Sequence, residues 1–213
     1  MGSQNAIPVR KRPKPGERRV QILQALATML ERPGAERITT AALAARLDVS
    51  EAALYRHFAS KAQMFEGLID FIEQSVFSLV NQIVDRETST TPADPSRDTL
   101  TGTRQAAKIV VMLLQFAEKN PGMTRVMVGD ALVFENERLQ QRMNQFFDKI
   151  ESAFKQSLRE FAAIDGSATP SVDTQVRASV LTAFVVGRLQ RFARSGFKRL
   201  PSEHIEASLA LIL

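Results

Sequence analysis

The sequence predicts an all-α protein of about nine helices. Apolar residues recur every three or four positions along most of the chain, for example at Leu23, Leu26 and Leu30. Strong helix breakers, such as Arg32-Pro33-Gly34 and Asn120-Pro121-Gly122, separate these periodic segments. No alternating strand pattern and no hairpin turn is evident between them. Apolar residues make up 44% of the chain, which is enough to form a sizeable core.

Composition divides the chain into three regions. Residues 1–15 carry three prolines and four basic residues, which predicts a disordered basic arm. Residues 16–59 contain three short helical segments, and we expect them to form one small domain. Residues 60–213 are expected to form a larger helical domain. Within it, residues 86–103 hold two prolines and almost no apolar side chain, which predicts a mobile loop.

The larger domain begins with a long helix that the sequence predicts from Ser60 onward. Ser60-Lys61-Ala62-Gln63 has the spacing of a capping box. Further helices are expected at roughly 105–119, in two pieces across 123–163, and at roughly 173–195 and 201–213. The apolar stripe expected to bury the long helix consists of Phe65, Leu68, Ile69, Ile72, Val76, Leu79, Val80 and Ile83.

Composition and motifs also exclude several classes of function. The chain has no Cys and only two histidines, His57 and His204, so we expect no disulfide and no metal site. It carries no phosphate-binding Gly loop and no nucleophile elbow, and we expect neither enzymatic activity nor a cofactor. The longest apolar run is the six residues 109–114, so we expect no membrane contact and a cytoplasmic location.

Charge is distributed unevenly along the chain. Residues 1–65 hold 11 Lys and Arg against 5 Asp and Glu, whereas residues 66–213 hold 17 against 18. A basic first third beside a nearly neutral remainder indicates either a surface that meets a polyanion or a solvated basic tail.

Residues 38–65 carry the most informative pattern, that of a helix-turn-helix. It consists of a short Ala-rich helix at roughly 40–47, a tight turn at Asp48-Val49 and a second short helix at roughly 50–57. Asp48 suits the turn because Asp tolerates a positive φ, and Ser50 is placed to cap the second helix. An ordinary helical hairpin is the alternative, but the turn, the cap and the basic charge together favour DNA binding.

The outer face of this segment provides the residues expected to contact DNA. Hydroxyl groups and backbone N–H groups at helix starts suit phosphate oxygens, Tyr55 suits the DNA backbone or a thymine methyl, and Lys61 suits a phosphate. The predicted DNA-binding residues are Thr39, Thr40, Ser50, Glu51, Ala52, Tyr55, Arg56, His57 and Lys61.

The same segment resembles the DNA-binding domain of the TetR family of bacterial regulators. The resemblance rests on Ile38-Thr39-Thr40, on Val49-Ser50, on Leu54 to Phe58 and on Ser60-Lys61. It departs from the family at Asp48, where members usually have Gly. The resemblance implies three DNA-binding helices followed by a larger helical domain whose last two helices pair with a second subunit.

A closer resemblance is to the nucleoid occlusion factors of that family. It rests on residues 50–73, on EKNPGMTR at 118–125 and on LQQRMNQFF at 139–147, and it covers most of residues 17–163. It implies a protein that binds palindromic double-stranded DNA on the nucleoid and acts on the tubulin-like division protein FtsZ while bound. It is also compatible with two dimers on one DNA site. The alternative within the same family is a ligand-responsive transcriptional repressor.

This resemblance further implies a partner-binding surface that includes Phe71, Met112, Lys119 and Asn120. On a helical wheel Phe71 lies away from the apolar stripe, so it is either covered by a neighbouring helix or part of a protein-binding groove. Leu79 replaces a basic residue of the relatives and also fits the apolar stripe. In a ligand-sensing protein the side chains of Met112, Phe116 and Met127 are candidates to line an inducer pocket; otherwise they belong to the core.

The last two predicted helices are more apolar than one subunit requires. Ala183 and Gly187, four residues apart, allow another helix to approach closely. Pairing these helices with those of a second copy gives a homodimer with the two-fold symmetry that a palindrome needs, although packing within one subunit is the alternative. The apolar positions are Val176, Val180, Leu181, Ala183, Phe184, Val185, Gly187, Leu189, Phe192, Ile205, Leu209 and Ile212.

Overall fold

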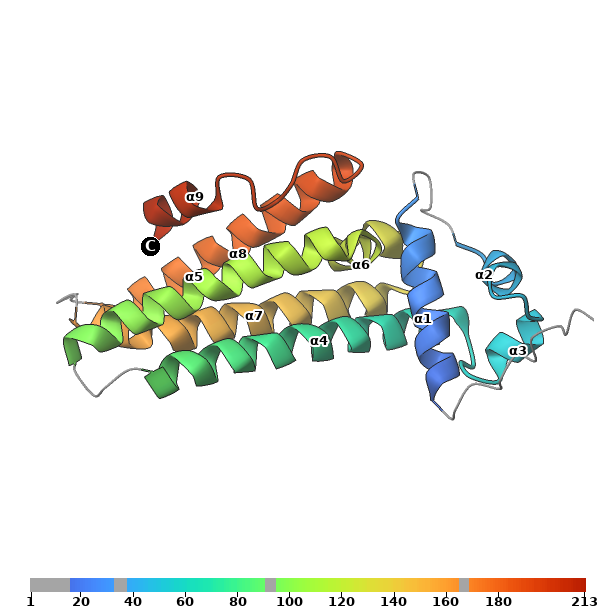
Figure 1. Cartoon of the computed structure of the whole chain (residues 1–213), viewed down its shortest axis with the longest axis horizontal. Coiled ribbons are helices and arrows are strands. Elements are labelled where there is room, and N and C mark those ends of the chain that lie inside the picture. Colours follow the sequence, from blue (N-terminus) through green and yellow to red (C-terminus); the bar gives the residue numbers. More distant parts are fainter. Residues whose placement is uncertain (1–15, 33–37, 91–94, 165–168) are drawn as a thin grey trace, which may run out of the picture.

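The computed structural model describes residues 16–32, 38–90, 95–164 and 169–213, and this part of the chain forms nine α-helices, one 3-10 helix and no strand (Figure 1). The predicted all-α fold is confirmed, while the predicted arm at 1–15 lies outside the described residues. The elements are α1 (Glu17–Leu30), α2 (Thr40–Arg46), α3 (Glu51–Tyr55), α4 (Lys61–Thr90), α5 (Pro95–Lys119), α6 (Pro121–Met127), η1 (Asp130–Leu132), α7 (Glu137–Ile164), α8 (Pro170–Arg194) and α9 (Ile205–Ile212).

Helices α1, α2 and α3 gather at one end of the elongated molecule (Figure 1). Their contact is apolar: Leu26, Leu43, Leu54 and Phe58 are all buried there. Asp48 adopts a φ of 54° between α2 and α3, which confirms the predicted turn. The two short helices are therefore held at a fixed angle by a small core and a sterically demanding turn.

Helix α4 leads away from these three helices and runs along the bundle beside α7 (Figure 1). Most of its predicted stripe is buried, including Phe65, Ile69 and Val76. The expectation that Leu79 lies in the buried stripe is wrong, because 37% of this residue is exposed. Leu79 lies at the edge of the stripe, where the neighbouring helices cover it only in part.

The predicted mobile loop at 86–103 is also wrong. Helix α4 continues to Thr90 and α5 already begins at Pro95. A polar sequence does not prevent a helix end from forming, and Pro is tolerated in the first helical turn, where its missing N–H needs no partner. Gly102 shows why small residues occur here: a Cβ at this position would lie 2.2 Å from the carbonyl oxygen of Ser157 on α7.

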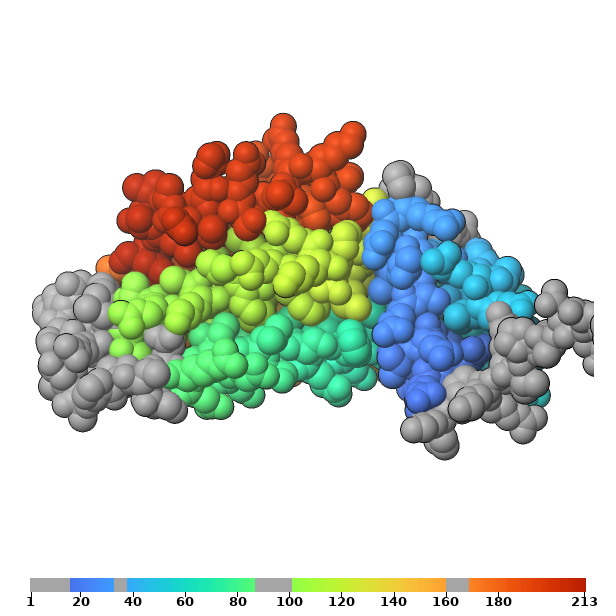
Figure 2. Space-filling view, in the orientation of Figure 1, coloured from blue at the N-terminus to red at the C-terminus, as the bar shows by residue number. Residues whose placement is uncertain are grey.

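The centre of the bundle is formed by the second half of α5, where the apolar run 109–114 lies. Ile109, Val110, Leu113 and Leu114 are fully buried there. Helices α8 and α9 cover one side of the bundle (Figure 2). Within the described ranges, no helix is both long enough and apolar enough to cross a membrane.

Candidate nucleic-acid interface

Helix α3 presents an open polar surface at the end of the molecule. Leu54 and Phe58 point inward and are buried, which turns Glu51, Ala52 and Tyr55 outward. Arg56, just after the helix, is exposed and His57 is half-buried. Tyr55 is 45% exposed, so much of its ring and its hydroxyl face solvent. Side chains on this face of α3 are therefore accessible to solvent in the single subunit.

Both helix starts on this surface are capped by hydroxyl groups. Thr39 Oγ1 accepts a hydrogen bond from the backbone N–H of Ala42 at 3.2 Å, and Ser50 Oγ accepts one from Ala53 at 3.3 Å. A capping hydroxyl acts as acceptor and keeps its own O–H as a donor. Thr39 and Ser50 are both exposed, so these donors are placed to bind phosphate oxygens.

A hydrogen-bonded chain joins the two helices of the motif. The hydroxyl of Thr40 on α2 donates to the carboxylate of Glu51 on α3 at 2.5 Å. The hydroxyl of Tyr55 lies 3.5 Å from the same Thr40 oxygen. Three residues that the sequence assigns to the DNA-binding surface are thus brought together, and each restricts the orientation of the next.

The helix-turn-helix pattern did not indicate a role for Arg19. This residue lies on α1, outside the motif, yet its guanidinium stands 4.1 Å from the centre of the Phe58 ring and donates to the carbonyl oxygen of His57. That carbonyl lies just after α3, where a cation interacts favourably with the helix dipole. Arg19 on α1 therefore stabilises the C-terminal end of α3 through the Phe58 ring and the His57 carbonyl oxygen.

Lys61 lies at the start of α4, close to the predicted surface, but its Nζ forms an ion pair with Glu135 in the turn before α7. The side chain of Glu135 is only 9% exposed. Among the nine residues predicted to contact DNA, Lys61 is therefore the one whose charge is paired with a carboxylate of the turn before α7.

The residues predicted to bind a protein partner occupy neighbouring helices. Phe71, in the third turn of α4, and Met112 on α5 are half-buried against the core. Lys119 is exposed at the end of α5, and the side-chain amide of Asn120 donates to the carbonyl oxygen of Phe116 at 2.8 Å. Lys119 and Asn120 thus lie where α5 meets α6, close to α1, and α4 begins at the same end of the bundle (Figure 1).

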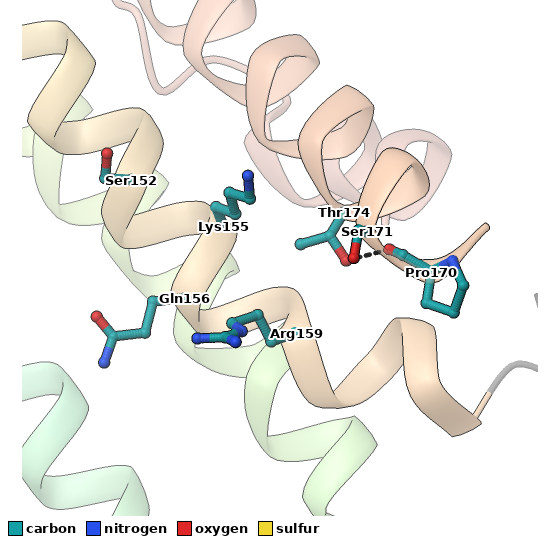
Figure 3. A pocket seen from close by; sticks show the side chains of 7 residues that line it. All are labelled: Ser152, Lys155, Gln156, Arg159, Pro170, Ser171 and Thr174. Atoms are coloured by element: carbon teal, nitrogen blue, oxygen red, sulfur yellow. Dashed lines mark hydrogen bonds between the residues drawn. The ribbon is translucent and has the colours of Figure 1, made fainter.

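A groove of about 560 Å³ lies elsewhere, between α7 and the start of α8 (Figure 3). Lys155 and Arg159 line it, together with hydroxyl-bearing residues such as Ser171 and Thr174. None of the three side chains considered for an inducer pocket lines this groove. Met127 is buried, and Met112 and Phe116 pack against the core.

Two family matches cover most of the chain. Residues 22–68 match the family described as "Bacterial regulatory proteins, tetR family", and residues 97–213 match the SlmA-like family described as "Tetracyclin repressor-like, C-terminal domain". The chain is 51% identical over 201 residues to the nucleoid occlusion factor SlmA of Aliivibrio fischeri, covering 94% of this chain and 96% of the relative. It is 51% identical over 196 residues to SlmA of Vibrio cholerae, covering 92% and 93% respectively.

The chain belongs to the SlmA group of the TetR family. Solved structures agree at the level of the fold. The regulator FadR from Bacillus halodurans superposes with a TM-score of 0.71 at 14% identity, covering 95% of this chain and 96% of that one. The regulator PfmR from Thermus thermophilus superposes with a TM-score of 0.66 at 20% identity, covering 91% of this chain and 97% of that one. Both support the arrangement of an N-terminal helix-turn-helix followed by a helical domain.

Proposed function

We propose that this protein is a nucleoid occlusion factor: a homodimer that binds palindromic double-stranded DNA and, while bound, inhibits FtsZ ring assembly over the chromosome. The observation that carries the proposal is about 50% identity to SlmA proteins over nearly the whole chain. The exposed polar face of α3 supplies the physical means of DNA binding. We place the protein on the nucleoid, in the cytoplasm.

The two parts of the chain would have different roles. Residues 16–59 would bind DNA, with α3 in the major groove, and residues 60–213 would regulate and dimerise. The direct contacts proposed are the hydroxyls of Thr39 and Ser50 on phosphates and the side chain of Tyr55 on the DNA backbone or a thymine methyl.

A seam along α8 supports the dimer. Val172, Val176 and Val180 recur every four residues on α8 and are all exposed in the single subunit. Gly187 continues the same helix, and a Cβ there would meet nothing within 4 Å. Since the subunit itself does not require a glycine at this position, close approach by a second subunit explains it better. Leu211 on α9 adds another exposed apolar side chain.

The surface for FtsZ would lie where α4, α5 and α6 come together. Phe71 offers partly exposed aromatic area and Lys119 offers an exposed positive charge. An aromatic group beside a cation suits a peptide that is both acidic and apolar. We propose Phe71, Met112, Lys119 and Asn120 as its contacts.

Selection of bound duplexes from a random pool, followed by mapping of the selected sequence on the chromosome, tests this function. We expect a palindrome that recurs around the chromosome and is sparse near the replication terminus. A single site beside the protein's own gene would instead indicate a local repressor, and the absence of any enriched sequence would contradict specific DNA binding.

A further inference from the structure

A basic turn follows α8 at the end of the bundle that lies near α1 (Figure 1). Residues 191–199 hold four basic residues and no acidic one. Arg191 and Arg194 lie in the last turn of α8, where the helix dipole favours positive charge. Lys198 and Arg199 lie beyond the helix and are exposed in the single subunit, and no carboxylate in the described part of the chain pairs with either. Packing within the subunit therefore does not account for these two charges.

Hydrogen bonds and ring contacts give this turn a defined shape. Ser195 Oγ accepts hydrogen bonds from the backbone N–H groups of Lys198 and Arg199, at 3.1 and 2.9 Å. Its own hydroxyl donates to the carbonyl oxygen of Phe192 at 2.8 Å. Phe197 adopts a φ of 65°, which a bulky residue rarely takes, and its ring packs edge-on against that of Phe192. The backbone that carries the two basic side chains is thus restrained before any partner binds, which lowers the entropic cost of binding.

The same turn packs against the junction of α5 and α6. The carboxylate of Glu118 on α5 accepts hydrogen bonds from the backbone N–H and from the hydroxyl of Ser202, at 3.0 and 2.5 Å. The guanidinium of Arg125 on α6 stands 5.1 Å from the centre of the Phe197 ring. Lys119, the residue after Glu118, is the exposed cation that we propose as a contact of FtsZ. The turn therefore lies next to the proposed partner surface and adds positive charge to it.

Arg125 is a further cation without an anionic partner at this junction. Its Nε is buried and has no hydrogen-bond partner among the residues that the structure describes. The neighbouring carboxylate of Glu118 is already engaged by Ser202. Because a cation away from water is favoured only beside compensating negative charge, this junction suits an anionic ligand.

We propose that the turn at 195–200 binds an acidic segment of the protein partner, with Lys119 and Arg125 as neighbouring cations. The inference rests on the proposed function and extends its partner surface from α4 and α5 to the end of α8. The apolar part of the same partner then lies on Phe71 and Met112. Duplex DNA fits the turn less well, because in Figure 1 the turn lies on the other side of α1 from α2 and α3.

Charge reversal of the turn tests the proposal. The proteins to compare are the wild type, Lys198→Glu with Arg199→Glu, and the charge-conserving variant Lys198→Arg with Arg199→Lys. Each protein is loaded on the immobilised selected palindrome, and its affinity for unassembled, GDP-bound FtsZ is measured over a range of salt concentrations. The matched control is Lys155→Glu with Arg159→Glu, which reverses an exposed lysine and an exposed arginine in the groove between α7 and α8.

The reversal should weaken FtsZ binding about tenfold and make it less sensitive to salt, because charges at an interface attract the partner from a distance. The charge-conserving variant and the control should bind FtsZ as the wild type does. The proposal is overturned if the reversed protein binds FtsZ like the wild type. It is also overturned if the reversal instead weakens binding to the duplex and reduces the log–log salt slope by about 0.9 for each lost contact, because the turn then binds phosphates.

Two additions keep the experiment decisive. Sedimentation velocity on the same proteins tests a second copy as the occupant: a reversed protein that is monomeric where the wild type is dimeric overturns the proposal. If the reversed protein does not fold, Lys198→Gln with Arg199→Gln removes both charges; a loss of about threefold in FtsZ affinity supports the proposal, and an unchanged affinity overturns it. Failure of the wild type on its palindrome to bind FtsZ at all contradicts the proposed function itself, whereas equal binding by wild type and reversed protein contradicts this inference alone.

Discussion

The Thr40 hydroxyl on α2 donates a hydrogen bond of 2.5 Å to the carboxylate of Glu51 on α3. The bond spans the tight turn of the motif and links the start of one helix to the first turn of the next. The Tyr55 hydroxyl lies 3.5 Å from the same Thr40 oxygen, so the exposed aromatic side chain stands next to this bond. Glu51, an acid on a surface expected to meet phosphates, is thereby held in one orientation.

Replacing Thr40 tests whether this link prepares the surface for DNA. Thr40→Val keeps the shape of the side chain but removes its hydroxyl, and specific DNA affinity should fall by about 1 kcal/mol, the usual worth of one hydrogen bond. Thr40→Ser retains the hydroxyl and should bind almost as the wild type does. The ratio of specific to non-specific dissociation constants is the measurement, and an unaltered ratio in Thr40→Val would show that the link has no part in recognition.

Tyr55 provides the most direct test of the α3 surface. Tyr55→Ala should reduce specific affinity by about 1–3 kcal/mol, because both the ring and the hydroxyl are lost. Tyr55→Phe keeps the ring, so its specific DNA affinity should fall by less than that of Tyr55→Ala. Leu200→Ala, at an exposed apolar position outside the motif, is the control. Titration of labelled palindromic DNA gives the affinities, and an identical isotherm for Tyr55→Ala would mean that α3 does not read the DNA.

The parts of the fold that sequence reasoning predicted correctly have local signals. Ser50 and Asp48 mark the motif because capping and a positive φ are properties of single residues and their neighbours. The loop predicted at 86–103 is absent because α4 and α5 extend into this range. Polar composition alone does not distinguish a loop from a helix end, and the small residue Gly102 is explained by its close packing against Ser157 on α7.

Long-range pairings had no such signal. Nothing in the sequence around Lys61 indicates Glu135, and nothing around Arg19 indicates Phe58, because these contacts depend on how whole helices pack. The burial of Leu79 was mispredicted for a related reason. A helical wheel gives the direction in which a side chain points. It does not show whether a neighbouring helix covers that position along the helix axis.

A charge in the α8 seam should separate the subunits. Val176→Asp places a carboxylate where a second apolar surface is expected, so the dimer should dissociate at concentrations at which the wild type remains dimeric. Ser152→Asp adds the same charge to an exposed position on α7 and serves as the control. Sedimentation velocity measures the oligomeric state. A dimeric Val176→Asp protein would place the interface elsewhere.

Phe71→Ala tests the surface proposed for FtsZ. The ring is only half-buried, so we expect the free energy of unfolding to fall by about 1–2 kcal/mol, less than for a fully buried Phe, with DNA affinity within about twofold of the wild type. Inhibition of FtsZ assembly should be clearly weaker. Phe77→Ala is a matched control, because Phe77 is also half-buried on α4 but packs edge-on against Phe146. Loss of DNA binding together with inhibition in Phe71→Ala would identify Phe71 as a core residue only.

Sedimentation of GTP-assembled FtsZ in the presence of the purified protein tests the central claim most directly. The protein with its selected palindrome should markedly reduce the amount of FtsZ polymer in the pellet, whereas the protein with a scrambled duplex should have little effect. Lys119→Glu, which reverses an exposed charge of the proposed partner surface, should bind the palindrome normally and inhibit poorly. If FtsZ sediments equally with the palindrome, with the scrambled duplex and without the protein, the proposed action on cell division is contradicted.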